Sequence, residues 1–443
     1  MKTNEKLYKI TLILVLLILA IIKILLVHPT YSDENFYFNV AKHILYYSLP
    51  YRDFFFAHPP IQIFILSSIY KVFGVSFTIG KLLTIVYSSV CVLLTYSIAK
   101  KLFGIKPAFF SSMLFVISPP FIAFSDISCG MWGVMLFLLM SIFFILKKRL
   151  FISSVFFTIA FFTRYITIFY IPVILTILYL KRLKAIRFIS VTLILTTILF
   201  LSLVFAFKNN YLKQTLIYHL SKRQTWQIEQ YLDMGLFFVI LGIFSIVIGI
   251  EIKNRCMTLI GLSTLIVDVL LLLSLKEIYY HYFLLSVPIY LVASSKIFEL
   301  DYNVVKFVIL AILLLSFIHN YQTISFYINP SYAKKFYFIS NIVNMSTYSD
   351  NKIFGEPVMT NYVSFITGRK ISGNYVDSYI QHIKFEGVAK TIQKLNQEKP
   401  EIIIEIPGYY SSIPELYQFI KTNYTILSYV NDTPSYIIYT LKR

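Results

Sequence analysis

The stretch ITLILVLLILAIIKILLV, residues 10–27, decides the fold class of this chain. It carries a single charged side chain, Lys23, and it is long enough to cross the hydrocarbon core of a bilayer as a helix. The run lacks the small residues of a signal-peptidase site, and Lys23 near its outer end can extend its ammonium group to the membrane interface. We therefore expect a retained transmembrane helix here rather than a cleaved signal peptide.

The composition of the whole chain leads to the same class of protein. Hydrophobic residues make up 58% of the 443 residues and charged residues only 14%, whereas soluble domains contain roughly 45–50% and about 25%. So few charges cannot cover so much apolar surface in water, which excludes a soluble or disordered protein. The net charge of +19 is expected where basic loops set membrane topology and contact anionic lipids, so it does not indicate a nucleic-acid partner.

Further apolar runs, some of them short, predict about eleven transmembrane helices in total. The eleven runs are residues 10–27, 82–99, 107–124, 130–146, 150–163, 165–180, 188–207, 235–250, 257–275, 279–294 and 307–320. With a cytoplasmic N-terminus, the inner segments hold 17 Lys and Arg residues and the longer outer segments hold 11. Because Lys and Arg favour the cytoplasmic side, the first long loop and the C-terminal tail are predicted to be extracytoplasmic.

The C-terminal tail differs from the rest of the chain in its pattern of polar and apolar residues. Residues 1–330 form the predicted transmembrane domain, and residues 331–443 alternate short strand-like and helix-like segments, as in a small soluble α/β domain. The tail contains no phosphate-binding loop, nucleophile elbow or metal motif, which favours an accessory role. Its predicted strands are Lys352–Phe354, Glu401–Ile406, Thr425–Val430 and Ser435–Thr440, and its predicted helices are residues 383–397 and 413–422.

The first outer loop, residues 28–81, gathers ionisable side chains and is the predicted location of the site. It includes YSDENFYFNVAKHILYYSLPYRDFFFAHPPIQIF, residues 31–64, in which Asp33 and Glu34 follow the first span directly. A carboxylate held at a membrane end with partly excluded water can serve as a general base for a hydroxyl acceptor. The alternative is a solvated loop in which Ser32 or Asp33 caps the following helix.

Three cationic or titratable side chains could bind a phosphate near these acids. Arg52 and Arg164 can each grip a phosphate with two parallel hydrogen bonds, and His58 is aimed by Pro59 and Pro60. The alternatives are a structural turn at His58 and simple extension of Arg164 to lipid headgroups. The apolar segment after His58, residues 61–73, is too short to span and is predicted to lie at the membrane interface.

Asp126 and His281 are weaker candidates for binding the donor phosphate or the substrate, and both are predicted to lie on the extracytoplasmic side. Asp126 lies in the turn SPPFIAFSDISCG, where an isolated aspartate is usually a turn residue. His281 lies in KEIYYHY, at the start of a span, where an aromatic belt explains the tyrosines equally well. Asp268 is placed in mid-span without an evident partner, and it could hydrogen-bond between helices.

The order and spacing of these residues resemble the GT-C glycosyltransferases, integral-membrane enzymes that use polyprenyl-phosphate sugars. The chain is most similar in pattern to the family 39 protein O-mannosyltransferases and the aminoarabinose-transferase-like group. The resemblance rests on the first span, Asp33-Glu34, Tyr51-Arg52-Asp53, His58-Pro59-Pro60, Asp126, Arg164, the His281-Tyr282-Phe283 to Pro288 segment and the C-terminal soluble piece. It implies a polytopic α-helical membrane protein with a small C-terminal α/β extracytoplasmic domain.

The resemblance also implies a reaction and roles for the candidate residues. The reaction is a single inverting displacement at the anomeric carbon of a polyprenyl-phosphate (dolichyl-phosphate) sugar, with the lipid phosphate as leaving group and a lipid, glycan or protein as acceptor. Asp33 matches the proposed general base, and Glu34 its partner in placing the acceptor or a metal. Arg52, His58 and Arg164 match groups that hold the donor phosphate. No cofactor is required throughout the fold, although Asp33 and Glu34 could bind a divalent cation.

A flippase or transporter of lipid-linked saccharides is the rival hypothesis from another functional class. Such proteins place ionisable residues at bilayer depth in broken, repeated helices. In this sequence the charges collect at the predicted outer interface, with Asp268 as the main exception. The sequence therefore favours the glycosyltransferase.

Overall fold

A computed structural model describes residues 2–46, 48–128, 130–222, 228–277, 279–432 and 434–442 of the chain. Its internal contacts divide the protein into two compact units. The helical unit consists of Met1–Leu26, Lys81–Leu203 and Arg223–Ile328, and the loop–sheet unit of Val27–Gly80, Val204–Lys222 and Asn329–Arg443. The first outer loop thus shares its contacts with the C-terminal segment, whereas the sequence-based division at residue 330 grouped it with the transmembrane helices.

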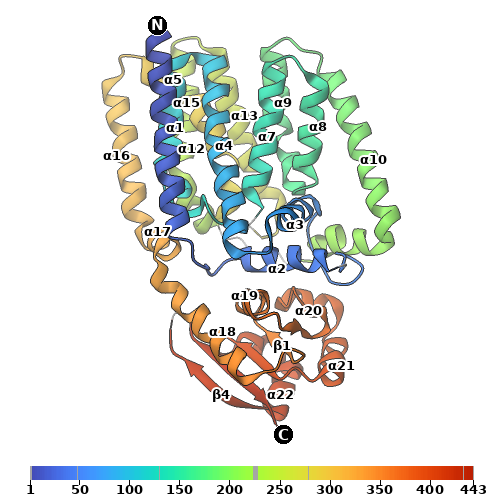
Figure 1. The fold of residues 1–443 in the computed structure, drawn as a ribbon. Helices are drawn as coiled ribbons and strands as arrows, with labels where there is room; N and C mark the ends of the chain where they lie inside the picture. The colour runs from blue at the N-terminus through green and yellow to red at the C-terminus, as the bar shows by residue number, and fades with distance from the viewer. Residues whose placement is uncertain are drawn as a thin grey trace. The chain divides into compact units, whose positions relative to one another are not determined.

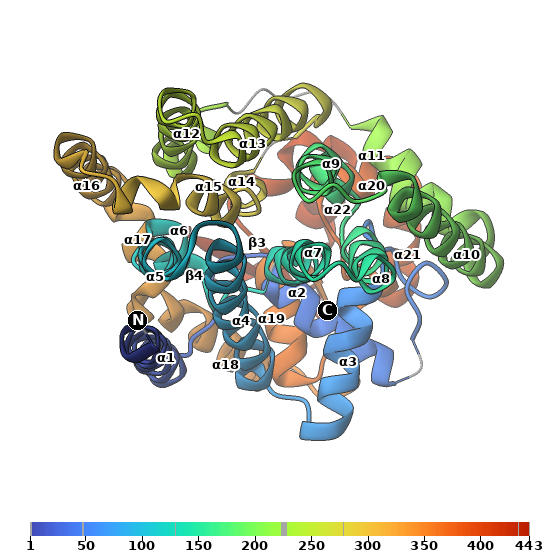
Figure 2. The same ribbon diagram turned by 90° about the horizontal axis from the view of Figure 1, so that it is seen from above.

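The helical unit is built from apolar helices that run along one another (Figures 1 and 2). Its α-helices are α1 Lys2–Leu25, α4 Phe77–Phe103, α5 Ile105–Val116, α6 Pro119–Phe124, α7 Met131–Leu146, α8 Leu150–Phe161, α9 Ile171–Leu180, α10 Ala185–Leu212, α12 Ile228–Glu251, α13 Arg255–Ser274, α14 Tyr280–Phe283, α15 Val287–Ser294, α16 Asn303–His319 and α17 Tyr321–Ile328, with the 3-10 turns η1 Tyr165–Tyr170 and η3 Ser295–Glu299. The first residues of α4 and the last of α10 belong to the loop–sheet unit.

Several of these helices are suited to a membrane. Within the described ranges, four are long and apolar enough to cross a bilayer, and the bent pair α16–α17 makes up to five. Six shorter apolar helices accompany them, at Ile61–Phe73, Ile105–Val116, Met131–Leu146, Leu150–Phe161, Tyr165–Leu180 and Gly235–Glu251. The chain is therefore an integral membrane protein, and the total of about eleven spans stays a prediction.

Two predicted spans differ in the structure. Residues 107–124 form two helices, because α5 ends at Val116 and α6 begins at Pro119, a residue suited to the first turn of a new helix. Residues 279–294 do not form one continuous helix, because α14 ends at Phe283 and α15 begins at Val287 after a turn. Pro288 accounts for this break, since proline is favoured in the first turn of a helix and disrupts its interior. The predicted break at Thr163-Arg164 is confirmed, because α8 ends at Phe161 and η1 begins at Tyr165.

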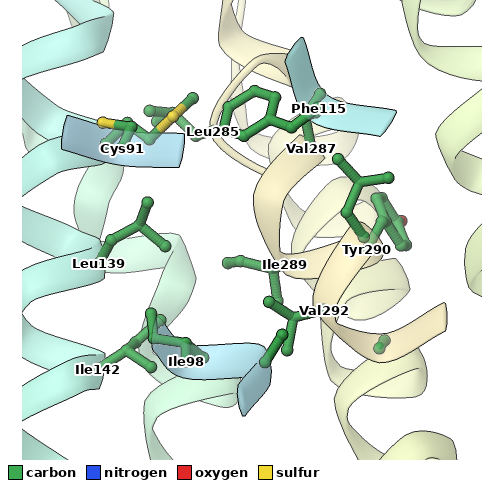
Figure 3. Packing of buried hydrophobic residues seen from close by; sticks show 14 of the residues in the cluster. Cys91, Ile98, Phe115, Leu139, Ile142, Leu285, Val287, Ile289, Tyr290 and Val292 are labelled. Carbon is green, nitrogen blue, oxygen red and sulfur yellow. The ribbon is translucent and has the colours of Figure 1, made fainter. Parts of the chain in front are cut away.

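Buried aliphatic and aromatic side chains fill the space between the helices (Figure 3). The cluster joins Cys91 of α4 and Leu139 of α7 to Ile289 and Tyr290 of α15. Close helix approach supports this packing: a Cβ atom added to Gly242 would lie 2.4 Å from Cε1 of Tyr290. Small residues at such crossings let membrane helices pack tightly where lipid provides no hydrophobic driving force.

The loop–sheet unit combines two helices of the first outer loop with an α/β segment. The loop contributes α2 Glu34–Leu45 and α3 Ile61–Phe73, and the predicted short helix at residues 61–73 is confirmed. The remaining elements are the π-turn η2 Lys213–Ile217, α11 Tyr218–Ser221, η4 Pro330–Ala333, α18 Lys334–Ser346, β1 Lys352–Gly355, α19 Pro357–Thr367, β2 Lys370–Ile371, η5 Ser372–Asn374, α20 Ile380–Glu386, α21 Val388–Glu398, β3 Ile402–Glu405, η6 Tyr409–Ser412, α22 Pro414–Asn423, β4 Tyr424–Val430 and β5 Tyr436–Leu441.

The five strands form one sheet in the order β2-β1-β3-β5-β4. β2, β1 and β3 are parallel, whereas β5 is antiparallel to both β3 and β4. All four predicted strands are present, and the two-residue strand β2 was not predicted. The predicted helix at residues 383–397 is split into α20 and α21 at Gly387, whose φ of +106° favours glycine.

Candidate active site

Asp33 occupies the N-cap position of α2 without using its side chain as a cap. Its carboxylate instead accepts a hydrogen bond from the phenol of Tyr379, with Oδ1 and the phenol oxygen 2.5 Å apart. Burial and the nearby Asp33 carboxylate raise the pKa of Tyr379, so the phenol stays protonated and donates. Asp33 itself is only partly buried. The partly exposed Asp33 carboxylate thus accepts a hydrogen bond from a neutral phenol.

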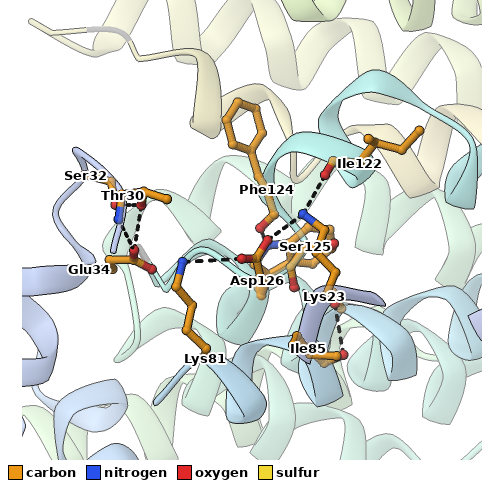
Figure 4. A network of polar contacts seen from close by, with 12 residues as sticks. Lys23, Thr30, Ser32, Glu34, Lys81, Ile85, Ile122, Phe124, Ser125 and Asp126 are labelled. Carbon is orange, nitrogen blue, oxygen red and sulfur yellow. Dashed lines mark hydrogen bonds and ion pairs between the residues drawn. The ribbon is translucent and has the colours of Figure 1, made fainter. Parts of the chain in front are cut away.

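Glu34 has a different environment from its neighbour. Its side chain is fully buried and accepts two hydrogen bonds from Thr30, from Oγ1 at 2.6 Å and from the backbone N–H at 3.2 Å (Figure 4). These bonds tie the start of α2 to the segment that precedes it. The pair predicted as one acidic feature therefore consists of a partly exposed carboxylate and an internal one.

A second acid, Glu356, is close enough for the charge of Asp33 to act on it, and the sequence analysis did not single it out. Glu356 is the N-cap of α19 and accepts hydrogen bonds from the backbone N–H groups of Val358 and Met359 at 3.1 and 2.9 Å. It also accepts a hydrogen bond from the Tyr31 phenol at 3.1 Å. Burial raises the pKa of Glu356 to about 7, and the charge of Asp33 adds to the increase.

The residues around Asp33 come from the loops that follow the parallel strands. Glu356 follows β1, while Asp377 and Tyr379 lie in the segment after β2. In open α/β sheets, ligands bind outside the carboxyl ends of such strands. Buried Asp377 adds a further acid there, since burial raises its pKa and the charge of His382 partly offsets the rise. The signal in the sequence was an acid directly after a short apolar strand, Lys352–Gly355, and before Pro357.

His58 is held by contacts on both its ring and its backbone. The Tyr51 phenol donates to the His58 carbonyl oxygen at 2.5 Å. The His58 ring stacks on that of His219, with centroids 5.5 Å apart, and lies edge to face with Phe56. Nε2 of His219 lies 2.8 Å from the carbonyl oxygen of Ala57. The imidazole pair was not predicted, because 161 residues separate its members and nothing in the sequence links them.

Arg52 lies on the surface of the same unit. Its guanidinium contacts the adjacent Asp53, with Nη2 2.8 Å from Oδ2, and 60% of the Arg52 side chain is exposed. The Asp53 carboxylate raises the pKa of Arg52. A role for Arg52 in holding the donor phosphate stays a prediction.

In the helical unit, Asp126 is the centre of a buried ion cluster (Figure 4). Its two carboxylate oxygens lie 2.6 Å from Nζ of Lys23 and 3.3 Å from Nζ of Lys81. Burial raises the pKa of Asp126, but the charges of Lys23 and Lys81 outweigh burial and lower it to about 2. The carboxylate therefore positions two ammonium groups and is more than a turn residue.

Arg164 and His281 come together in the helical unit. Arg164 is buried at the break between α8 and η1, in extended backbone, and its charge acts on His281 at the start of α14. Asp268 of α13 is hydrogen-bonded to Ser286, with Oδ1 and Oγ 2.6 Å apart, and to the phenol of Tyr290. The expected hydrogen bond of Asp268 between helices is confirmed.

The predicted site residues thus form two groups. Asp33, Glu34, Arg52 and His58 belong to the loop–sheet unit, and Asp126, Arg164 and His281 to the helical unit. In the described part of the chain, no three side chains of His, Cys, Asp or Glu converge in a way that could hold a metal ion. Asp33 and Glu34 hydrogen-bond to Tyr379 and Thr30.

Comparison with known proteins gives both a family match and structural matches. The family model described as dolichyl-phosphate-mannose-protein mannosyltransferase matches residues 57–208, a stretch that contains His58, Asp126 and Arg164. A comparison with curated protein sequences gave no match. ArnT from Cupriavidus metallidurans, solved with bound undecaprenyl phosphate, superposes with a TM-score of 0.68 at 12% identity, over 98% of this chain and 97% of ArnT. The chain has the GT-C glycosyltransferase fold.

A second GT-C structure matches less closely. The archaeal oligosaccharyltransferase AglB from Archaeoglobus fulgidus, solved with an inhibitory peptide and a dolichol-phosphate, superposes with a TM-score of 0.53 at 11% identity. The match covers 98% of this chain and 74% of AglB. The resemblance to GT-C glycosyltransferases expected from the sequence is confirmed.

Proposed function

We propose that this GT-C protein transfers a sugar from a polyprenyl-phosphate-linked donor to an acceptor hydroxyl at the extracytoplasmic membrane face, by an inverting displacement. The observation that carries the proposal is the hydrogen bond between Tyr379 and the Asp33 carboxylate. Asp33 is the N-cap residue of α2, but its side chain does not cap the helix. The chain also shares its fold, over nearly its whole length, with ArnT solved with undecaprenyl phosphate.

In the proposed reaction, Asp33 accepts the proton of the acceptor hydroxyl as the oxygen attacks the anomeric carbon. The bond between that carbon and the lipid phosphate breaks, and the phosphate leaves with the electron pair. A leaving phosphate needs cationic or hydrogen-bonding stabilisation more than it needs a protonating acid. Arg52, His58, Arg164 and His281 are the groups proposed to provide it, and Asp126 is proposed to act through the lysines that it holds.

Tyr379 is proposed to position the base. Its hydrogen bond fixes the direction of the Asp33 carboxylate, and its own ring is anchored in the segment after β2. Glu34 is proposed to act similarly by keeping the start of α2 bound to Thr30. A divalent cation at Asp33 and Glu34 remains a testable addition to this scheme.

The test is sugar transfer in membranes that contain equal amounts of wild type, Asp33→Asn or His58→Ala, supplied with labelled polyprenyl-phosphate hexoses or pentoses and a crude acceptor extract. Because general base catalysis contributes typically 10²–10⁴-fold, we expect Asp33→Asn to lose transfer by about that factor. Asp350→Asn, at an exposed position in the C-terminal segment, is the matched control. Repeating the assay with EDTA and with added Mg²⁺ or Mn²⁺ tests the cation.

Two outcomes would overturn the proposal. If Asp33→Asn transferred sugar at the wild-type rate, Asp33 could not be the general base. Protein-dependent movement of the labelled lipid between leaflets, without transfer to any acceptor, would favour the flippase alternative.

A further inference from the structure

The α7–α8 and α9–α10 turns lie at the end of the helical unit that carries the N-terminus (Figure 1). A cavity of about 460 Å³ opens between them. Two connections form it, the turn between α7 and α8 and the turn between α9 and α10. Five cationic side chains line it: Lys148, Arg149, Arg182, Lys184 and Arg187. We call it the basic cavity. All of its residues belong to one unit, and Asp126 and Arg164 lie beyond the opposite ends of α7 and α8.

The cations of the basic cavity have no acidic counterpart. The sequence contains no Asp or Glu from residue 127 to residue 228, and within the described ranges no ion pair joins any of the five to a carboxylate. Some other cations on the predicted cytoplasmic side are paired, as Lys9 is with Glu5 at 2.8 Å and Lys296 is with Glu299. Like charges around one concavity repel unless an anion enters it.

The backbone holds these cations in place. α7 and α9 end in the same way, with the N–H of Arg149 bonded to the carbonyl of Phe144 and the N–H of Leu183 to the carbonyl of Leu178, both at 2.9 Å. The residues between, Lys148 and Arg182, adopt φ of +60° and +51°, a conformation that glycine usually supplies at helix ends. The chain thus places cations at two positions where glycine would be less strained.

The walls of the basic cavity are mixed in character. Beside its three guanidinium groups lie apolar side chains, including Leu183 and the 60%-exposed Phe151. Guanidinium groups match phosphate oxygens with parallel hydrogen bonds, and basic pockets between membrane helices bind anionic headgroups. An apolar rim next to the cations fits an amphipathic anion better than a free inorganic one.

We propose that the basic cavity binds the phosphate headgroup of an anionic phospholipid. The site would be occupied from the leaflet on the side of the α7–α8 and α9–α10 turns. It is separate from the residues proposed for sugar transfer, and its test does not depend on that activity.

Native mass spectrometry of the full-length protein, released from nanodiscs of phosphatidylcholine with phosphatidylglycerol, tests the proposal. We expect wild type to retain a phosphatidylglycerol molecule and the triple variant Arg149→Gln/Arg182→Gln/Arg187→Gln to bind it at least about tenfold more weakly. The matched control is Lys106→Gln/Lys253→Gln/Arg255→Gln, which removes three exposed cations from turns or helix ends outside the cavity. Arg187→Gln alone, on the exposed face of α10, covers the case in which the triple variant fails to fold.

Three results would overturn the lipid site. Equal losses in the cavity and control variants would mean diffuse attraction of the whole basic surface. Displacement of the lipid by millimolar inorganic phosphate, with one phosphate bound in its place, would make a soluble anion the ligand. Unchanged binding in both the triple and the Arg187→Gln variants would leave the cavity without this role.

Discussion

At the scale of single residues, Asp33 and Glu34 differ in burial and in hydrogen-bond partners because they occupy different positions at the start of α2. Asp33 is the N-cap, so its side chain is free to turn toward Tyr379, whereas Glu34 is turned inward onto Thr30. Two adjacent carboxylates that look equivalent in the sequence therefore differ in exposure and partners. The proposed role of general base therefore falls to the partly exposed Asp33.

Replacing Tyr379 by Phe removes the hydrogen bond to Asp33 and keeps the ring. If this bond positions the base, we expect kcat to fall by about ten- to a hundredfold with little change in KM for the lipid donor, because one charge-assisted hydrogen bond contributes about 1.5–3 kcal/mol. Steady-state transfer kinetics measure this change. Tyr348→Phe, at an exposed tyrosine, is the control. Wild-type kcat in Tyr379→Phe would contradict the positioning role.

The raised pKa of Glu356 predicts a pH dependence of stability. The folded protein keeps this proton up to about pH 7, whereas the unfolded chain releases it near 4.5. Unfolding between these values therefore releases a proton, so stability falls as pH rises from 4.5 to 7, by an amount on the order of 3 kcal/mol. Lys335 and Asp33 also act on this region through their charges.

Glu356→Gln should remove this decline. Thermal unfolding of wild type and variant in detergent at pH 5 and pH 7.5 gives the difference directly. We expect the variant to gain stability relative to wild type at the higher pH. Glu415→Gln, at an exposed glutamate, should behave like wild type, and a difference between Glu356→Gln and wild type that does not change with pH would refute the assignment.

At the scale of secondary-structure elements, the Asp126 cluster ties α1 and α4 to the segment after α6. Asp126→Leu leaves the buried ammonium of Lys81 without this carboxylate, and loss of one partner of a buried pair costs about 3–5 kcal/mol. We expect a clear fall in melting temperature and in the yield of monodisperse protein. Asp301→Leu, at an exposed acid of the same unit, is the control.

A double variant separates charge from packing. Asp126→Leu/Lys81→Met removes the carboxylate and the fully buried ammonium together, while Lys23 retains some exposure. The melting temperature should recover part of the loss, because no buried charge is left at position 81. A double variant less stable than Asp126→Leu would show that the cluster acts through packing alone.

The elements themselves were largely predictable from the sequence. Long apolar runs predicted most helices of the helical unit, and short apolar runs predicted four of the five strands, because both patterns are local. β2 was not predictable, because a strand of two residues is too short to show an alternating pattern. The break between α14 and α15 was missed because the apolar run is continuous there, and Pro288 is its one local sign. The contacts of Asp33 with Tyr379 and of Asp126 with Lys81 were out of reach, since they join distant positions that no local pattern connects.

At the scale of the whole molecule, the contacts of the first outer loop with the C-terminal segment make that segment part of the proposed site. α2 packs on α19, and Asn39 donates to Asn361 at 2.9 Å. A chain that ends at residue 328 keeps every helix of the helical unit, so we expect it to insert into membranes and resist alkaline extraction. Its transfer should fall by at least the factor expected for Tyr379→Phe, because the shortened chain lacks Tyr379 and every other contact of the first outer loop with the C-terminal segment.

The measurement is transfer activity beside membrane extraction for the two chain lengths at matched expression. Transfer at the full-length rate by the shortened chain would return the C-terminal segment to an accessory role. Failure of the shortened chain to insert would contradict the independence of the helical unit.

The hydrogen bond between Asp33 and Tyr379 spans 346 positions of the chain, and this separation has a consequence for biosynthesis. Ribosomes add about 5–20 residues per second, so Asp33 is synthesised about 17 to 70 seconds before Tyr379. During that interval the sequence of the membrane helices has been made, but the proposed base lacks the phenol that orients it. If Asp33 is the base, as proposed, a chain acquires its oriented carboxylate only once the C-terminal segment has been made and folded.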